Sequence, residues 1–254
     1  MIDARGNTAP VSYLMISLPA ERVVIARHTT FDGDIQLQRR LLPDNSTAFE
    51  IISNGVFLMS SYSQISERAL ATCTLKAINP GLFSELRILL GGLGMGFTLQ
   101  ETLANKAASV DVVEVSHHIV AWNRTHLAAI NGNVLADPRV KLIQADLYTV
   151  LSTASPASYS AILLDVDNGP SWLVYEDNAR LYTLDALKQW SAMLMPGGAL
   201  AVWSAQPEPE FLKRMMTVFG DTNEISIVAP NIKNEPTEYF IYWSLANFEI
   251  FSGA

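Results

Sequence analysis

A glycine cluster between an apolar run and a helical pattern is the first feature of this sequence that could bind a ligand. Residues 86–103 read LRILLGGLGMGFTLQETL, with glycine at Gly92, Gly94 and Gly96. Glycine has no side chain, so such a loop lets the backbone approach a ligand closely. The spacing is G-x-G-x-G, which differs from the G-x-G-x-x-G of dinucleotide sites, and no Gly-Lys-Ser/Thr follows. The loop therefore favours a nucleoside without a cradled pyrophosphate, or a tight turn with no ligand.

Three acidic residues follow the next apolar runs and could complete a nucleoside pocket. Glu114 comes 18 residues after Gly96, where a carboxylate can accept both ribose hydroxyls. Asp146 ends the run LIQAD and is placed to accept a hydrogen bond from the adenine amine, and Asp165 ends the run AILLD. Each acid alone could equally be a helix N-cap. Together they describe an adenosine pocket with one carboxylate left for chemistry.

A parallel sheet would bring the glycine loop and the three acidic residues to one edge. The pattern from residue 63 onward predicts such a sheet. Helical periodicity is expected over residues 63–78, 97–106, 117–130, 180–194 and 208–219. Seven apolar runs are expected to be strands: 86–90, 110–114, 140–145, 160–166, 199–204, 224–228 and 239–245. Alternating strands and helices predict a Rossmann-like, doubly wound α/β fold with a mainly parallel seven-stranded sheet. Ligands of such sheets lie at the carboxyl ends of the strands.

The first part of the chain has a different pattern. Residues 22–27, 34–42, 48–53 and 56–61 are rich in β-forming residues, and turn residues separate them. Asn54-Gly55 between two apolar runs is a strong hairpin signal. We therefore expect a small β-rich N-terminal domain over residues 1–62 and a larger ligand-binding domain over residues 63–254.

Composition narrows the class of protein. Of the 254 residues 49% are hydrophobic and 17% charged, so a large core is expected. The formal net charge of −8, without a basic cluster, argues against nucleic-acid binding and favours a cationic small molecule. No apolar run approaches a membrane span, and the early run VSYLMISL at residues 11–18 lacks the basic flank of a signal peptide, so we expect a cytoplasmic protein.

Metal and hydrolase chemistry find little support. The single cysteine excludes a disulfide or a cysteine-based metal site. The adjacent His117 and His118 are expected to diverge on a helix, and no second pair of ligands has metal spacing, so no metal is predicted. There is also no Gly-x-Ser-x-Gly elbow of a serine hydrolase.

At this point the sequence resembles a known family. The segments ILLGGLGMGFTLQETL, VDVVEVSHHIVAWNR, DPRVKLIQADLYTVL and YSAILLDVDNGP are similar to the spermidine synthase-like branch of the S-adenosylmethionine-dependent methyltransferase fold, over roughly residues 86–205. The resemblance implies S-adenosylmethionine or decarboxylated S-adenosylmethionine as cofactor. It implies that Gly92, Gly94 and Gly96 line the methionine-derived tail, Glu114 holds the ribose, Asp146 with its neighbour Leu147 holds the adenine, and Asp165 is the catalytic carboxylate. A homodimer joined through the β-rich piece is the corresponding assembly.

The chain departs from this family where a diamine substrate would bind. Met95 replaces an acid of the glycine loop, Leu58 replaces a glutamine, Ile65-Ser66 replace a Tyr-Gln pair before Glu67, and Asn168 replaces the second acid of Asp-x-x-Asp. Asp167 adjoins that position, and in an extended chain it would point the same way as Asp165. Asp165 and Asp167 are therefore the predicted catalytic residues, acting on a cationic amine.

The sequence is compatible with three functions. The first is a spermidine synthase-like transfer of an aminopropyl or methyl group to a small acceptor, in which Asp165 takes up or orients the proton of an amine. The second is a methyltransferase that acts on another small molecule, which the loss of the acid at Met95 favours. The third is a catalytically silent nucleoside-binding module. The sequence names neither the acceptor nor the oligomeric state.

Overall fold

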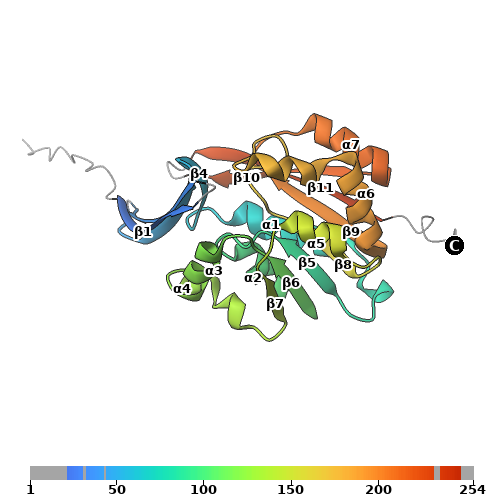
Figure 1. Cartoon of the computed structure of the whole chain (residues 1–254), viewed down its shortest axis with the longest axis horizontal. Helices are drawn as coiled ribbons and strands as arrows, with labels where there is room; N and C mark the ends of the chain where they lie inside the picture. Colours follow the sequence, from blue (N-terminus) through green and yellow to red (C-terminus); the bar gives the residue numbers. More distant parts are fainter. Residues whose placement is uncertain (1–21, 31–32, 43, 232–234, 247–254) are drawn as a thin grey trace, which may run out of the picture.

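The computed structural model describes residues 22–30, 33–42, 44–231 and 235–246. A small sheet lies beside a larger α/β unit, as Figure 1 shows. The apolar run at residues 11–18 lies outside the described residues. No helix among the residues that the structure describes is long and apolar enough to cross a membrane.

The large sheet has seven strands in the order β10-β11-β9-β8-β5-β6-β7. Neighbours from β9 to β7 pair in parallel, whereas β11 pairs antiparallel with both β9 and β10. Only β11 therefore runs against the other strands, which confirms the mainly parallel seven-stranded prediction. The strands are β5 (Arg87–Gly91), β6 (Ser109–Val113), β7 (Val140–Ile143), β8 (Tyr159–Leu164), β9 (Leu194–Ser204), β10 (Asn223–Pro230) and β11 (Pro236–Leu245).

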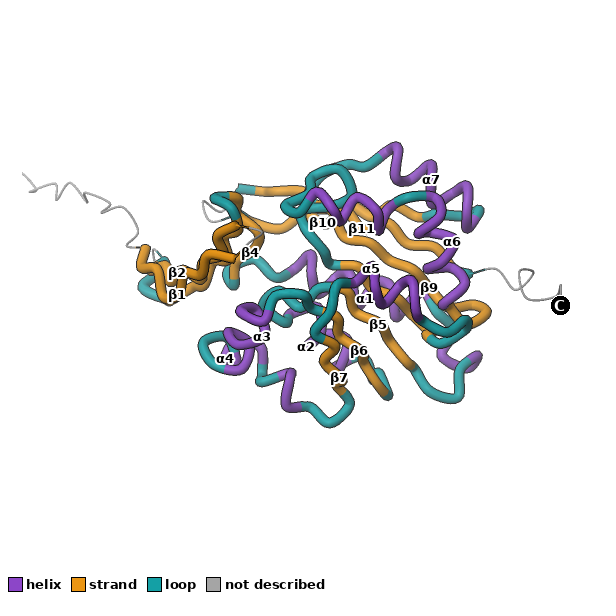
Figure 2. Tube along the Cα trace, in the orientation of Figure 1, coloured by secondary structure: helices purple, strands orange, loops and turns teal. Residues whose placement is uncertain are grey.

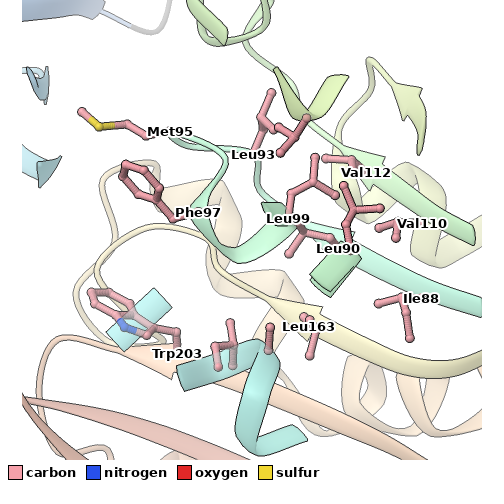
Figure 3. Packing of buried hydrophobic residues seen from close by; sticks show 14 of the residues in the cluster. Ile88, Leu90, Leu93, Met95, Phe97, Leu99, Val110, Val112, Leu163 and Trp203 are labelled. Carbon is pink, nitrogen blue, oxygen red and sulfur yellow. The ribbon is translucent and has the colours of Figure 1, made fainter. Parts of the chain in front are cut away.

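Helices cover both faces of this sheet (Figure 2). Because successive strand residues point to opposite faces, Ile88 and Leu90 of β5 belong to one buried cluster and Leu89 to the other. The first cluster is completed by α1 (Ile65–Ala77), α2 (Phe97–Ala104) and α3 (His117–Arg124), and the second by α5 (Leu147–Thr153), α6 (Leu184–Met193) and α7 (Pro209–Phe219). Figure 3 shows part of the first cluster around β5 and the glycine loop.

The small sheet is an antiparallel meander that joins the first buried cluster. Its strands are β1 (Arg22–Thr30), β2 (Gly33–Leu41), β3 (Thr47–Ser53) and β4 (Val56–Ser60), in that order. The predicted Asn54-Gly55 hairpin joins β3 to β4. Ile35, Leu37 and Ile51 are buried with residues of α1 and α2. The sheet is thereby fixed beside the carboxyl edge of the large sheet, where the predicted site residues lie.

Several predicted elements have different bounds in the structure. The helix predicted over residues 117–130 is broken at Thr125, whose ψ of −90° is not helical, so that α4 (Ala128–Asn131) is separate. Strand β9 begins at Leu194 and runs through Pro196-Gly197-Gly198, which was expected to precede it. Here the pairing with β8 changes register, and a Cβ on Gly198 would lie 2.8 Å from the Ser160 carbonyl oxygen.

Short elements were also missed by the sequence pattern. Helix α5 was not predicted, and neither were the 3-10 turns Pro80–Leu82 and Val134–Ala136. Part of the helix predicted from residue 180 is a third 3-10 segment, Glu176–Tyr182. The strands predicted at residues 224–228 and 239–245 are longer in the structure, because β10 and β11 pair as far as Pro230 and Pro236.

The fold makes a direct prediction about Trp190 of α6. This side chain is fully buried, and its indole N–H donates to the Leu181 carbonyl at 3.1 Å, which ties α6 to the 3-10 segment Glu176–Tyr182. Trp190→Ala should lower the free energy of unfolding by about 3–5 kcal/mol, measured by urea denaturation, because it leaves a large cavity. Trp172→Ala is the matched control: its side chain is 46% exposed, so a loss within about 0.5 kcal/mol is expected. Equal losses in the two variants would contradict the packing described.

Candidate active site

The candidate site lies where the order of the strands reverses. From β5 the chain proceeds outward to β6 and β7, and then returns to the other side of β5 to form β8. Ligands of doubly wound sheets bind at this switch point. The glycine loop follows β5 and Asp165 follows β8, so the two features singled out in the sequence are neighbours at the switch point.

Backbone contacts hold the glycine loop and the loop that begins at Asp165 together. The Asp165 N–H donates to the Gly91 carbonyl at 2.9 Å, and the Gly92 N–H donates to the Val113 carbonyl at 2.9 Å. Gly92 has a φ of +89°, and a Cβ at this position would lie only 2.1 Å from the Asp165 carbonyl oxygen. A side chain at Gly92 would push the glycine loop away from Asp165. Glycine is therefore required at position 92 for the contact between the two loops, whether or not a ligand binds.

Two buried asparagines fix the next part of the glycine loop. Asn123 of α3 donates to the Gly94 carbonyl at 2.7 Å, and Asn131 of α4 donates to the Met95 carbonyl at 3.0 Å. Asn131 also donates to Asn123 Oδ1 at 2.7 Å. Neither residue was predicted from the sequence. The sequence shows only a polar residue at a helical position that faces the core. Its role is evident only when its hydrogen-bond partner in the glycine loop is known.

Glu114 directly follows β6 and turns its carboxylate toward the glycine loop. Its Oε2 accepts from the Leu93 N–H at 3.0 Å and its Oε1 from the Ser116 N–H at 2.8 Å. The residue is 9% exposed, and burial raises its pKa while these backbone donors lower it in part. A carboxylate can accept about four hydrogen bonds, so Glu114 retains capacity for ribose hydroxyls.

Asp146 has two protein partners. It is the N-cap of α5, with Oδ1 accepting from the Tyr148 N–H at 2.7 Å, and its Oδ2 accepts from Arg180. The Arg180 guanidinium also lies over the Tyr148 ring, 4.6 Å from its centroid. Leu147 is buried in the second cluster beside Gly91. The N-cap alternative considered for Asp146 is thus present, and Arg180, which the sequence did not indicate, occupies the oxygen expected to meet adenine.

Asp165 directly follows β8, and its backbone lies against the start of the glycine loop. Its Oδ2 accepts from the Thr98 hydroxyl at 2.6 Å, at the start of α2. Burial raises the pKa of Asp165 to about 6, and the Thr98 hydrogen bond lowers it in part. Its side chain is partly exposed, and the described contacts include no hydrogen bond to its Oδ1. One oxygen is therefore held by the protein and the other can meet a ligand.

Asp167 does not share this environment. Strand β8 ends at Leu164 and Asp167 has a φ of +57°, so the extended backbone that would align Asp167 with Asp165 is not formed. The Asp167 carboxylate accepts from the Val174 N–H at 3.3 Å and from the Asn178 amide at 2.8 Å. These contacts order the loop before α6. Its catalytic role stays a prediction.

A second buried carboxylate lies near Asp165. Glu67 of α1 is 7% exposed, and its backbone carbonyl lies 3.3 Å from the Thr98 hydroxyl that donates to Asp165. Burial, with the charge of Asp165 as the second cause, raises the pKa of Glu67 to about 7. The sequence placed Glu67 after two substituted family positions but gave it no role. Only the packing of α1 against α2 brings it to the site.

Methionines occupy the surface expected for the tail of the nucleoside. Met95 is fully buried, and in Figure 3 its side chain points away from β5. The sulfur of Met59, from β4, would lie 2.7 Å from a Cβ on Gly94 and is 3.2 Å from the Met95 backbone nitrogen. The small sheet thus covers Gly94 with a flexible apolar side chain, which can move aside more easily than backbone.

Three of the four histidines form an aromatic cluster between β1 and the start of α3. His28 of β1 stacks on His118 with ring centroids 3.7 Å apart, and the ring of His117 lies 3.8 Å from that of His118. The expected divergence of His117 and His118 is therefore wrong, because the two rings are neighbours. Within the described ranges, no three histidine, cysteine or acidic side chains are grouped so that they could hold a metal ion.

Comparison with known proteins shows which proteins this chain is similar to. No family model matches it. It is 28% identical over 156 residues to a polyamine aminopropyltransferase of a Synechococcus strain (57% of this chain, 47% of the relative) and 31% identical over 137 residues to one of Prochlorococcus marinus (52% and 45%). The chain is therefore similar to polyamine aminopropyltransferases over about half of its length. It spans about half the length of the curated relatives it matches.

Solved spermidine synthases share the fold. One, in complex with the transition-state analogue AdoDATO, superposes with a TM-score of 0.71 at 16% identity, covering 88% of this chain and 74% of that one. The Thermotoga maritima spermidine synthase gives a TM-score of 0.70 at 16% identity, covering 88% and 73%. The fold of this chain is thus one that solved spermidine synthases share.

The glycine loop yields a stability prediction. Gly92→Ala places a Cβ against the Asp165 carbonyl, whereas Gly55→Ala, also at a positive φ (+77°), meets nothing within 4 Å. Gly55→Ala should lower the free energy of unfolding by about 1–2 kcal/mol, the cost of a left-handed alanine. Gly92→Ala should cost at least about 2 kcal/mol more, because backbone must shift. Equal losses in urea denaturation would show that the loops are not in close contact.

The raised pKa of Asp165 predicts a pH dependence of stability. The folded protein holds the Asp165 proton more tightly than the unfolded chain, with a pKa of about 6 against 3.8. This contribution is complete below about pH 4 and is lost as the pH rises through about 6. Asp165→Asn should therefore gain stability relative to the natural chain between pH 4 and pH 8. Two pKa units correspond to at most roughly 3 kcal/mol, and partial exposure reduces this. A pH-independent difference in urea midpoints would contradict it.

Proposed function

We propose that the chain binds an S-adenosylmethionine-type nucleoside at the switch point and transfers an alkyl group from it to a small amine. The observation that carries the proposal is the Asp165 carboxylate, held by Thr98 through one oxygen beside the glycine loop. The similarity to polyamine aminopropyltransferases supports aminopropyl transfer as the reaction class. S-adenosylmethionine itself, and with it methyl transfer, is the finer alternative that the buried Met95 favours.

The residues present fit the nucleoside once two side chains, Met59 and Arg180, have moved. Glu114 beside Leu93 would hold the ribose, and the glycine loop would face the tail once Met59 moves from Gly94. Asp146 would accept the adenine amine after Arg180 leaves its Oδ2. Arg180 could then remain over Tyr148, because that contact does not involve Asp146. When bound, the sulfonium supplies an activated carbon with a neutral thioether as leaving group.

The chain's own residues prepare the amine. At neutral pH an aliphatic amine is protonated and cannot attack, so it must lose its proton near the reacting carbon. The free Oδ1 of Asp165 can accept that proton, and a carboxyl with a pKa of about 6 is a stronger base than an ordinary aspartate. Holding amine and nucleoside in line also contributes, up to about 7–11 kcal/mol in the best cases.

Two further assignments belong to this proposal. The domain division at residues 62 and 63 fits the two separate sheets. A homodimer could form through the small sheet, where Val24, Leu41 and Phe57 are exposed apolar residues.

The proposal is tested by separating binding from transfer. Titration calorimetry with S-adenosylmethionine, its decarboxylated form and 5′-methylthioadenosine should show binding of at least one of them. Asp165→Asn should retain that affinity within a few fold and lose transfer to amines by about 10²–10⁴-fold, because it removes the proton acceptor. Asp185→Asn, an exposed aspartate at the start of α6, is the control and should keep full activity. Unaltered transfer by Asp165→Asn would refute its role, and a chain that binds no nucleoside would refute the proposal.

A further inference from the structure

The small sheet contacts α3 through a stack of imidazole rings, the histidine cluster of His28, His117 and His118. His28 of β1 lies face to face with His118, with ring centroids 3.7 Å apart and an interplanar angle of 12°. His117 lies 3.8 Å from His118, and the indole of Trp122, one turn further along α3, lies 6.1 Å from His28. His28 and His118 are half-buried, and His117 is exposed. A charge on any of these rings therefore arises in contact with another ring that can also be charged.

The charged groups that neighbour the cluster do not neutralise it. Asp34 of β2 accepts from the Thr29 hydroxyl at 2.6 Å and from Arg27, so this acid and this cation are paired with each other. Glu114, before α3, turns its carboxylate to the glycine loop. Arg124 lies in the last turn of α3 and is exposed. Among the described residues, no ion pair or hydrogen bond involves the three imidazoles, and the charges that act on His118 are those of the other two rings.

The stacked geometry makes protonation, rather than metal binding, the chemistry open to this cluster. A metal ion bound by an imidazole lies in the ring plane, about 2.0–2.1 Å from the nitrogen. Two nearly parallel rings 3.7 Å apart do not share such a position, and no metal-binding group occurs in the part of the chain that the structure describes. Imidazole is, however, the side chain that ordinarily gains its charge between about pH 5 and 8.

Three features of the fold oppose a charge on the cluster. His117 and His118 are the first two residues of α3, after the N-cap Ser116, where the helix dipole disfavours a cation. Burial, followed by the charges of His28 and His117, lowers the pKa of His118. The folded protein therefore binds this proton less tightly than the unfolded chain. The stability that the neutral cluster contributes is complete above about pH 6.5 and is lost as the pH falls through the lower pKa of the folded state.

We propose that the histidine cluster is a pH-sensitive contact that holds β1 against α3 while its rings are neutral and releases β1 when they are protonated in mildly acidic solution. Strand β1 is at the edge of the small sheet, so it can separate from α3 while Ile35, Leu37 and Ile51 keep the other strands in the first buried cluster. The same helix carries Asn123, which donates to the Gly94 carbonyl, so the contact borders the support of the glycine loop. The ring contacts need no ligand, and the switch is independent of the proposed function.

The coupling of charges is tested by proton NMR of the histidine ring signals between pH 4.5 and 8.5. In the natural chain His118 should titrate below the ordinary histidine value of about 6.5. His28→Phe should move the His118 midpoint to higher pH, because a stacked ring remains but its charge is gone. His126→Gln, at an exposed position outside the cluster, is the control and should leave the midpoint unchanged. The same His118 midpoint in the natural chain and in His28→Phe would overturn the coupling.

The release of β1 is tested by hydrogen exchange with mass spectrometry at pH 5.5 and 7.5, corrected for the pH dependence of the chemical exchange rate. In the natural chain, peptides from β1 should lose protection at least about tenfold at pH 5.5, the effect of one pKa unit, whereas those from β5 should change by less than about threefold. His28→Phe should keep β1 protected at both pH values, and His126→Gln should behave like the natural chain.

Two results would overturn the pH-sensitive contact. One is β1 protection in the natural chain that is equal at the two pH values, and the other is an equal loss in the natural chain and in His28→Phe. Should His28→Phe fail to fold, His118→Phe removes the charge from the other side of the same stack and carries the same expectation.

Discussion

The hydrogen bond from the Asp165 N–H to the Gly91 carbonyl is the contact on which the candidate site depends. It is the last hydrogen bond between β5 and β8, and it brings the glycine loop against the loop that carries Asp165 on the other side of the switch point. A side chain at Gly92 would meet the Asp165 carbonyl, so this junction can form only with glycine there. The two halves of the site are consequently parts of one backbone arrangement.

Around this junction the protein uses two kinds of polar contact. Asn123 and Asn131 are neutral and buried; each donates to one carbonyl of the glycine loop, and Asn131 also donates to Asn123, which fixes the position of the loop. Asp165 and Glu67 are ionisable and have spare acceptor capacity, which leaves them able to respond to a ligand. Met59 and Arg180 lie over the predicted tail and adenine positions, and both are long side chains that can be displaced without moving the backbone. Neutral amides thus fix the glycine loop, whereas the side chains that border it can move or change their charge when a ligand binds.

The sequence was sufficient for the parts of this account that depend on local patterns. Alternating apolar runs and helical periodicity predicted the sheet, its mainly parallel pairing and the small β-rich piece, and strand ends placed Glu114 and Asp165 at one edge. What the pattern missed requires tertiary information. Glu67 and Asn131 are unremarkable polar residues until α1 and α4 pack against the loop. Arg180 meets Asp146 only because the segment before α6 folds back, and the left-handed turn at Asp167 separates it from Asp165.

A crystal structure with bound 5′-methylthioadenosine tests the central claim most directly. The account predicts the ribose hydroxyls on Glu114, the adenine amine on Asp146 with Arg180 moved away, Met59 displaced from Gly94, and the thioether facing Asp165. A nucleoside bound elsewhere, or a rim still closed by Met59 and Arg180 at saturating ligand, would contradict it.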